Sequence, residues 1–317
     1  MIQEAVFLVI GLAVLLVSGD ILVRGAVALA TALNVPPLLV GLTIVAFGTS
    51  APELVVAIQA VMAGSDGIAM GNIVGSNIAN VLLVLGLPAL IYPMSTHVPG
   101  LPRNAAIMLA ATAAFAALAY AFQAITPMTG LALFGGIIAF VVYSGVRAAR
   151  EDSDALLDDV AEFAGAGVST RTVLFIVFGL LGLPFGAHLL VDSGSTIAQA
   201  LGVRDAVIGL TIVAFGTSLP ELATVAAAAL HKKSDVAIGN VVGSNIFNLL
   251  AVGGAAGLAG GAGFDASALS FDIPVMIATS IALAVFVFTK RDIGRMSGFG
   301  MALAYAAFIA FLAARAL

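Results

Sequence analysis

The sequence predicts an all-α membrane protein: ten transmembrane helices in two inverted five-helix repeats, with both termini outside. Three observations predict this fold. Of the 317 residues, 62% are hydrophobic and only 9% are charged, whereas a soluble domain is nearer half apolar and a quarter charged. Apolar runs of about 20 residues, the length that crosses a bilayer as a helix, follow one another along the chain. Finally, two motifs each occur twice, at the same spacing.

The composition excludes several classes of protein. A chain this apolar is neither an ordinary cytosolic domain nor a disordered one. It has no Cys, which excludes a disulfide scaffold, thiol redox chemistry and thiolate metal sites. A net charge of -5 with only 12 Lys and Arg makes no basic face, so we expect no nucleic acid partner. The expected surroundings are a lipid bilayer, and nothing in the sequence requires a protein partner.

The apolar runs define ten predicted spans. All are taken as helices, because an isolated strand cannot satisfy its backbone in lipid and a membrane barrel would show short alternating segments. The predicted spans are residues 5–30, 37–62, 68–91, 104–122, 128–147, 171–198, 206–230, 236–260, 270–289 and 297–315.

The longest polar stretch, residues 148–170, divides the chain into halves 1–147 and 171–317. Six acidic residues lie between positions 151 and 162. We interpret the stretch as an acidic cytoplasmic connector. The alternative, a regulatory cation site, lacks the alternating Asp/Asn ligands and central Gly of a calcium loop.

The distribution of Lys and Arg predicts the orientation in the membrane. With the N-terminus outside, ten of the twelve basic residues fall at or near the cytoplasmic side, and only Arg204 and Arg315 fall outside. This asymmetry is typical of cytoplasmic loops. We therefore expect a multi-pass protein of the cell (inner) membrane with both termini extracytoplasmic.

The repeat relates the two halves. GLTIVAFGTSAPEL at 41–54 matches 209–222 at thirteen of fourteen positions, and AMGNIVGSNIAN at 69–80 matches 237–248 at nine of twelve. The offset is 168 residues in both cases. Five spans per half is an odd number, so the second half enters the membrane from the opposite side. Transporters with this plan place their substrate site at the midplane. A purely structural duplication would have little reason to repeat Glu, Asn, Ser and Thr.

Glu53 and Glu221 occupy equivalent positions inside the second and seventh spans. A carboxylate at membrane depth is costly unless it has a partner, faces water or serves a site. No Lys or Arg lies at a plausible depth beside them, so a bound cation is the expected partner. The alternative is that both are protonated and only hydrogen-bonded.

Pro52 and Pro220 precede the two glutamates and predict a break in each helix. Such breaks free backbone carbonyls, which survive in a membrane only where they line a site. The predicted oxygen ligands are carbonyls and hydroxyls, although a hydroxyl can instead bond back to the preceding helical turn. They are Ala46 and Ala214 for carbonyls, and Thr49, Ser50, Thr217 and Ser218 for hydroxyls.

The third and eighth spans carry a polar face. Asn72, Ser76 and Asn80 are spaced i, i+4, i+8 and therefore lie on one side of a helix. Ser76, Asn80 and their equivalents Ser244 and Asn248 are predicted ion ligands. Asn72, Asn77 and their equivalents are as readily explained by hydrogen bonds between helices.

The predicted ligand set consists of oxygen atoms only. Carboxylate, amide, hydroxyl and carbonyl oxygens suit Ca²⁺, Na⁺ or Mg²⁺ and are unsuited to Zn²⁺ or Cu⁺. Flexible coordination by many oxygens favours Ca²⁺ over Mg²⁺.

The GTS-x-PE and GN-x-VGSN-x-x-N motifs, each present twice, resemble the calcium/cation antiporter superfamily, in particular its prokaryotic sodium/calcium exchanger branch. The resemblance covers essentially the whole chain. It implies a secondary active antiporter, not an enzyme, that exchanges Ca²⁺ for Na⁺ by alternating access and needs no cofactor. It also implies that the first and sixth spans slide across the core.

The resemblance assigns roles to the candidate residues. Glu53 and Glu221 are implied as shared Ca²⁺ and Na⁺ ligands, with Thr49 and Thr217 beside them. The implied Na⁺ ligands are Ser50, Ser76, Ser218 and Ser244, with carbonyls from Ala46 and Ala214.

This chain departs from the pattern at Asn80 and Asn248, since sodium-coupled archaeal relatives usually carry one Asn and one Asp there. Two carboxylates balance one Ca²⁺ or two protons, whereas three Na⁺ leave one excess positive charge in a low-dielectric site. The alternative is therefore an H⁺/Ca²⁺ antiporter in which Glu53 and Glu221 carry the protons.

Two further classes of protein, an intramembrane hydrolase and a passive channel, fit the sequence less well. An intramembrane hydrolase needs a nucleophile beside a base, and no such motif accompanies His188. A passive channel shares the ligand chemistry but usually builds its pore from several chains or filter loops. Asp20, Arg24, His188 and Asp192 are interpreted as helix-end pairs and snorkelling charges, with a gating role for His188 as a hypothesis.

Overall fold

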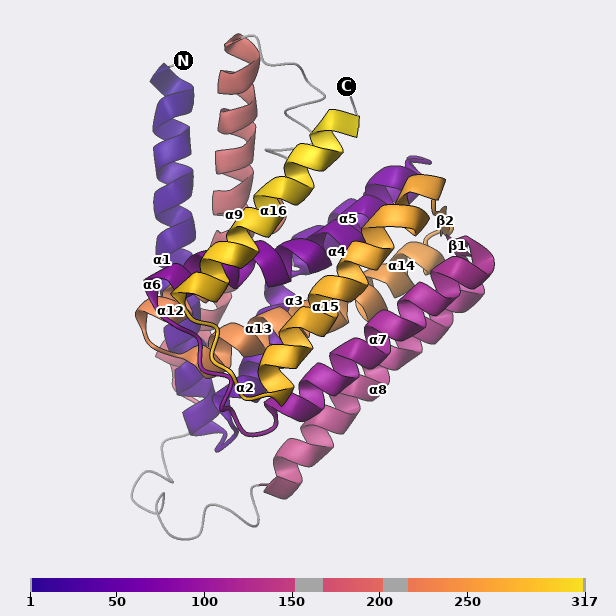
Figure 1. Ribbon diagram of the computed structural model, residues 1–317. Helices are drawn as coiled ribbons and strands as arrows, with labels where there is room; N and C mark the ends of the chain where they lie inside the picture. The colour runs from indigo at the N-terminus through magenta and orange to yellow at the C-terminus, as the bar shows by residue number, and fades with distance from the viewer. Residues whose placement is uncertain (1, 152–167, 202–215, 316–317) are drawn as a thin grey trace.

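The computed structural model describes residues 2–151, 168–201 and 216–315, and most of them are helical (Figure 1). The first half begins with one long helix and continues with two interrupted ones, each of which contains a π-helix. Its elements are α1 (Ile2–Ala32), α2 (Pro37–Val40), η1 (Gly41–Val45), α3 (Ala46–Thr49), α4 (Ala51–Met62), α5 (Asp66–Ala79), η2 (Asn80–Val84), α6 (Gly86–Ile91), α7 (Leu101–Phe122), β1 (Ala124–Ile125) and α8 (Pro127–Glu151).

The second half repeats the order of the long helices wherever the structure describes it, although β2 lies before α15 whereas β1 follows α7, and η5 has no counterpart in the first half. Its elements are α9 (Thr170–Ala200), α12 (Leu219–Leu230), α13 (Ser234–Phe247), η4 (Asn248–Val252), α14 (Gly253–Leu258), β2 (Ala262–Gly263), η5 (Ala268–Asp272), α15 (Ile273–Phe288) and α16 (Arg295–Arg315).

Eight helices of the described residues are long and apolar enough to cross a membrane, or nine when the bent pair 37–49 and 51–62 counts as one span. These agree with the predicted spans to within a few residues at each end. Of the predicted seventh span, 206–230, the structure describes α12 but not residues 206–215. Residues 152–167 of the predicted connector also lie outside the described residues.

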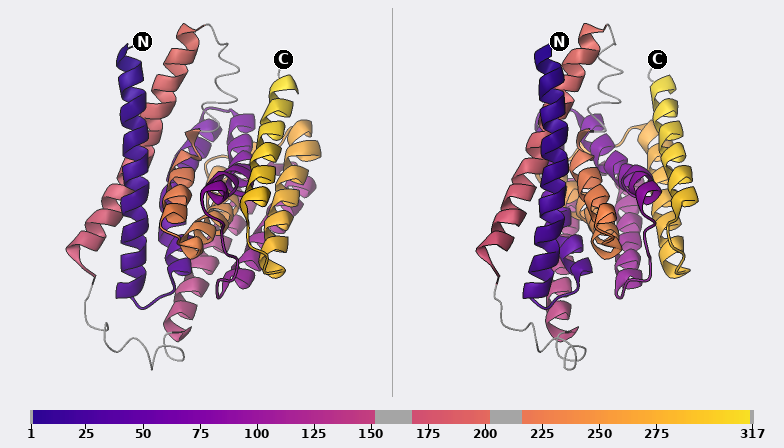
Figure 2. Two further views of the ribbon diagram at one scale, coloured as in Figure 1. Left: turned by 60° about the vertical axis from the view of Figure 1, so that its left-hand side comes forward. Right: turned by 90° about the vertical axis from the view of Figure 1, so that its left-hand side faces the viewer.

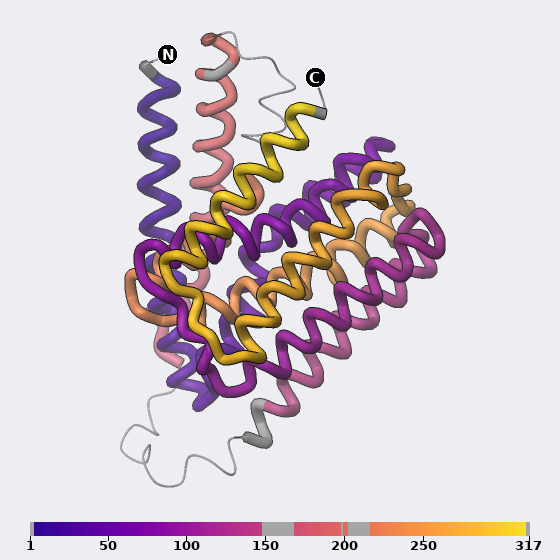
Figure 3. The backbone as a smooth tube through the Cα atoms, viewed as in Figure 1, coloured from indigo at the N-terminus to yellow at the C-terminus, as the bar shows by residue number. Residues whose placement is uncertain are grey.

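Helices α1 and α9 form a long antiparallel pair at one edge of the molecule (Figures 2 and 3). Glycines allow their backbones to approach closely. A Cβ on Gly179 would lie 2.6 Å from the Cβ of Leu22, and one on Gly11 would lie 2.9 Å from the carbonyl oxygen of Gly186. Small residues at such contacts are typical of helix packing in membranes, where no hydrophobic effect drives helices together.

The contacts between the halves repeat at the sequence offset. Thr112 on α7 and Ser280 on α15 are equivalent positions, and their hydroxyl oxygens lie 3.4 Å apart. At one end of the molecule Ile125 of β1 pairs with Ala262 of β2. At the opposite end Met94 pairs with Ile293. Since 94 + 168 = 262 and 125 + 168 = 293, the second pairing is the image of the first. This is the pattern that a twofold axis between α7 and α15 produces.

The first turns of α1 and the last turns of α16 lie at the same end of the molecule, whereas α8 ends and α9 begins at the other end (Figures 1 and 2). The structure thus places the start of α1 and the end of α16 on the same side of the molecule. Which side faces the cytoplasm stays a prediction.

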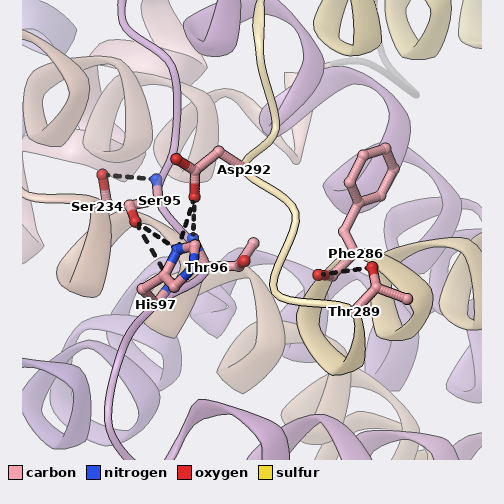
Figure 4. A network of polar contacts seen from close by, with 7 residues as sticks. All are labelled: Ser95, Thr96, His97, Ser234, Phe286, Thr289 and Asp292. Carbon is pink, nitrogen blue, oxygen red and sulfur yellow. Dashed lines mark hydrogen bonds and ion pairs between the residues drawn. The ribbon is translucent and has the colours of Figure 1, made fainter.

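A polar network joins the loop after α6, the loop after α15 and the start of α13 (Figure 4). The N–H of Thr96 donates to Asp292 Oδ1 at 3.1 Å, and His97 Nδ1 lies 3.2 Å from the same oxygen. The N–H of Ser95 donates to the hydroxyl of Ser234 at 3.1 Å. Partial desolvation acts to raise the pKa of Asp292, but hydrogen bonds from Thr96, Ser95 and His97 outweigh it and hold the pKa below its ordinary value of 3.8.

A second polar cluster joins α1 to the end of α12. Asp20 pairs with Arg24 on its own helix at 2.9 Å and with His231 Nε2. Asp20 and Arg24 therefore form an ion pair, but the pair lies inside α1 and not at a helix end as predicted. His188, which is exposed, makes no polar contact with any other described residue, and its gating role stays a hypothesis.

Candidate ion site

The two predicted helix breaks lie directly before the two glutamates of the candidate site. Ser50, between α3 and α4, has φ −86° and ψ 6°, and its equivalent Ser218 has φ −89° and ψ 4° before α12. Pro52 and Pro220 are the second residues of the helices that follow, where proline is tolerated because its missing N–H has no helical partner. The segments before and after Ser50 are bent by 41°.

Glu53 and Glu221 lie in the first turns of α4 and α12 and are 1% and 0% exposed. The partial positive charge at a helix N-terminus stabilises a carboxylate in this position. The hydroxyl of Ser50, three residues before Glu53, contacts the carboxyl group of Glu221, so the two glutamates lie near each other. They come from the two halves of the chain, so the breaks bring both charges to one place.

These carboxylates have few protein partners. The hydroxyl of Ser50 donates to Glu221 Oε1 at 3.1 Å. The other oxygen of Glu221 and both oxygens of Glu53 are buried and have no hydrogen-bond partner among the described residues. A buried charge without a partner costs several kcal/mol, and a bound cation removes that cost.

The carbonyl and hydroxyl candidates differ in their burial and in their hydrogen bonds. Thr49 Oγ1 is buried and lies 3.3 Å from both the Ala46 carbonyl oxygen and Asn240 Oδ1. The Ala46 carbonyl also accepts from the N–H of Ser50 at 3.0 Å, so in this conformation the break does not leave it without a protein partner. A carbonyl oxygen has two lone pairs, and the role of Ala46 as an ion ligand stays a prediction. The bond survives because the backbone departs from helical angles at Ser50, after its N–H group along the chain. Ala214 lies outside the described residues, and Thr217 is half-buried.

The polar faces of α5 and α13 contribute the remaining candidates. Ser76 is 4% exposed, and Asn80, Ser244 and Asn248 are 0% exposed. Asn80 and Asn248 are the first residues of the π-helices η2 and η4. Such wide turns occur frequently at functional sites. Both π-helices begin at equivalent positions, so the local widening is part of the repeat.

Several asparagines join helices, as the alternative interpretation proposed. Asn72 on α5 donates to the carbonyl oxygen of Glu53 on α4 at 3.0 Å. Asn240 accepts from Thr49, and Asn245 accepts from the amide of Asn80 at 3.1 Å. Asn77, by contrast, donates within its own helix to Ile73 at 2.7 Å.

Several of the candidate residues carry buried oxygen atoms without a hydrogen-bond partner. Within the part of the chain that the structure describes, four neutral buried oxygens from candidate residues lack a hydrogen-bond partner: Ser218 Oγ, Ser244 Oγ, Asn80 Oδ1 and Asn248 Oδ1. No cluster of three or more His, Asp or Glu side chains occurs in the described residues. The site therefore offers two carboxylates and several neutral oxygens, which fits a hard cation.

The sequence matches the family described as sodium/calcium exchanger protein over residues 4–146 and 171–314, which is most of its length. The chain belongs to this family. It is therefore a multi-pass membrane protein of a family of exchangers, as the duplicated motifs indicated.

Individual relatives of the exchanger family match along nearly their whole length. The chain is 38% identical over 307 residues to the putative antiporter CaxA of Alkalimonas amylolytica, covering 94% of this chain and 95% of that protein. It is 33% identical over 339 residues to the sodium/calcium exchanger MaX1 of Methanosarcina acetivorans, covering 96% and 97%. It is 33% identical over 293 residues to the inner membrane protein YrbG of Escherichia coli, covering 92% and 90%.

The fold of this exchanger-family chain has a solved counterpart. A structure of the sodium-calcium exchanger NCX_Mj, soaked with Na⁺ and Sr²⁺, superposes with a TM-score of 0.85 at 30% identity and covers 98% of both chains.

Sequence reasoning missed one residue near this site. Met108 on α7 lies outside both repeated motifs, and its sulfur accepts from Asn245 Nδ2 at 3.8 Å. The one signal in the sequence is that its equivalent, Met276, is also Met.

Proposed function

We propose that this exchanger-family protein moves Ca²⁺ across the membrane in exchange for Na⁺ by alternating access at a midplane site. The observation that carries the proposal is the pair of buried glutamates, from equivalent positions in the two halves, whose oxygens largely lack partners among the described residues. The cation is cargo, so the protein needs no resident cofactor and performs no enzymatic chemistry.

In this proposal each half, 1–147 and 171–317, contributes five of ten spans and one side of the site. Glu53 and Glu221 bind Ca²⁺ and Na⁺ in turn, and the carbonyl oxygens of Ala46 and Ala214 complete the set. The neutral side chains that bind with them are Thr49, Thr217, Ser50, Ser218, Ser76, Ser244, Asn80 and Asn248.

A second candidate is H⁺/Ca²⁺ exchange. The observation that favours it is the neutral amide at both Asn80 and Asn248, which leaves two carboxylates as the formal charge of the candidate site. Two protons discharge two carboxylates completely, one on each, when Ca²⁺ leaves.

We also propose the inner membrane as the location, with both termini extracytoplasmic and the 148–170 connector in the cytoplasm. The bias of Lys and Arg supports this orientation, and the name of the relative YrbG supports the membrane.

The test is ⁴⁵Ca²⁺ uptake into proteoliposomes. One set is loaded with Na⁺, and the other holds no Na⁺ but has an acidic interior. Uptake with internal Na⁺ alone supports Na⁺/Ca²⁺ exchange. Uptake driven by the proton gradient alone supports the second candidate. If neither the Na⁺ gradient nor the proton gradient drives uptake, both candidate functions are overturned.

Glu53→Gln and Glu221→Gln provide the site control in the same assay. Each removes one of two negative charges with little change of shape, so we expect each variant to lose at least about 99% of uptake, because a buried charged contact contributes roughly 3 kcal/mol or more. Near wild-type uptake in either variant would contradict the site assignment.

A further inference from the structure

We infer that Met108 and Asn245 are positioning residues, which fix the amide of Asn80 so that its oxygen faces the transported cation. The inference rests on the proposed function, because it takes Asn80 as a ligand. Neither Met108 nor Asn245 belongs to the proposed ligand set.

Three buried side chains form a chain of contacts from α7 to η2. Asn80 Nδ2 donates to Asn245 Oδ1 at 3.1 Å. Asn245 Nδ2 in turn donates to Met108 Sδ at 3.8 Å. All three residues are 0% exposed. Asn80 Oδ1, the atom at the end of this chain, is buried and has no hydrogen-bond partner among the described residues.

The thioether of Met108 determines the direction of both hydrogen bonds in this series. A side-chain amide donates from its nitrogen and accepts at its oxygen, whereas a methionine sulfur only accepts. Turning Asn245 over would set its oxygen against Sδ, and its nitrogen against the nitrogen of Asn80. Asn80 would then have to turn as well, and it would present an NH₂ group, which repels a cation, in place of an oxygen.

The equivalent residues of the other half lack this chain. Met276, 168 residues after Met108, is also 0% exposed. Yet Asn77 donates to Ile73 of its own helix at 2.7 Å, and both amide atoms of Asn248 have no partner in the described part of the chain. The oxygen of Asn80 is therefore held in place by neighbours, whereas the amide of Asn248 is free to turn.

A ligand held in its binding orientation loses less conformational freedom when the ion arrives, which raises affinity. The effect belongs to binding, because the chain of contacts touches neither carboxylate. It should therefore change the apparent KM for Ca²⁺ and leave the maximal transport rate nearly unchanged.

The test compares Met108→Leu with the matched control Met276→Leu, using initial rates of ⁴⁵Ca²⁺ uptake over a range of Ca²⁺ concentrations. Leu is close to Met in volume but cannot accept a hydrogen bond. We expect Met108→Leu to raise the KM for Ca²⁺ about threefold to tenfold, the effect of losing one hydrogen bond. The control should stay within about twofold of wild type. Equal KM values in the two variants would overturn the inference.

Met108→Gln provides a second, independent reading. Its side-chain oxygen can accept from Asn245 at similar reach, so we expect a KM near the wild-type value. A KM at least about threefold above wild type in Met108→Gln would overturn the inference, and this criterion holds even if Met108→Leu does not fold. The inference can fail while the proposed function stands. This is the case when the wild type transports Ca²⁺, the Glu53→Gln variant does not, and the KM values of the Met108 variants contradict the inference. A wild type without Ca²⁺ transport would overturn the proposed function, and the inference with it.

Discussion

Asn80 and Asn248 determine the formal charge of the candidate site, since they are the buried amides that stand where a carboxylate would add a third charge. With Glu53 and Glu221 the site carries two negative charges at most. One Ca²⁺ balances them, whereas three Na⁺ leave an excess charge that a low-dielectric site accommodates poorly. In the proposed function, single residues therefore decide which ion drives the movement of Ca²⁺.

Replacing Asn248 by Asp should strengthen the dependence on Na⁺ because it restores a third negative charge. We expect the half-saturating internal Na⁺ concentration for ⁴⁵Ca²⁺ uptake to fall about fivefold, since a contact to a charged group contributes about 1 kcal/mol more than a neutral one. Asn248→Ser is the neutral control. An unchanged Na⁺ dependence in the Asp variant would contradict the argument from charge.

The sequence predicted some of these residues and not others, for a physical reason. Glu53 and Glu221 are visible because a carboxylate inside an apolar run is costly wherever the chain folds. Met108 is not visible, because its contact with Asn245 spans 137 positions. The hydrogen bond from Ser50 that engages the Ala46 carbonyl closes the last turn of α3, and residue types alone do not show whether that turn closes.

At the scale of elements, the pair of α1 and α9 depends on glycine. Gly11, Gly179 and Gly186 lie where a side chain would meet the backbone or Cβ of the facing helix. The hydropathy pattern predicts both helices. It does not predict that they touch, because small residues that permit an approach do not say which helix approaches.

Gly179→Ala should destabilise this pair, since the new Cβ would lie 2.6 Å from the Cβ of Leu22. Overpacking of this kind costs about 1–3 kcal/mol. We expect a lower Tm in detergent than for wild type. Gly145→Ala on α8 is the control, because no atom lies within 4 Å of its new Cβ in the described structure. An unchanged Tm for Gly179→Ala would show that the helices separate without loss.

The loop network around Asp292 makes a prediction about pH. Its pKa is held below the ordinary value of 3.8 in the folded protein, so its contribution to stability is present above that value and is lost as the pH falls through the lower, folded pKa. Asp292→Asn should therefore lower Tm at neutral pH but not in strong acid. A Tm difference that persists unchanged in strong acid would exclude the ionised carboxylate as its cause.

The π-helices η1, η2 and η4 mark the limit of prediction for elements. The two helix breaks follow from Pro52 and Pro220, whose chemistry is local. A π-turn is rare and has no comparable residue requirement. Hence the sequence predicts where these helices break but not where they widen.

At the scale of the whole molecule, two nearly identical halves make different contacts. Ser50 donates to Glu221, whereas the equivalent hydroxyl of Ser218 and both oxygens of Glu53 are unpartnered within the described ranges. The hydrogen bond from Asn80 to Asn245 likewise has no equivalent at Asn248 among the described residues. Gly71 is exposed and its equivalent Gly239 is buried. Because transporters with inverted repeats alternate between two such arrangements, we expect a second conformation of this protein in which the halves exchange their contacts.

Ser50→Ala and Ser218→Ala should therefore shift the conformational balance in opposite directions. The chain contains no Cys, so Gly71→Cys provides a single reporter thiol that is exposed in this conformation. Without ions, Ser50→Ala should slow its labelling about fivefold, the effect of losing one hydrogen bond of about 1 kcal/mol. Ser218→Ala should leave labelling equal or faster. Shifts in the same direction would contradict the exchange of contacts.

The contact between Thr112 and Ser280 has a different standing from all of these. Because the two positions are related by the repeat, the proposed exchange of contacts between the halves brings the same two hydroxyl groups together again. Losing this contact therefore removes it from both end states, so we expect a small effect on which face of the membrane the protein prefers. What it can change is the height of the barrier between the faces, and hence the pace of turnover.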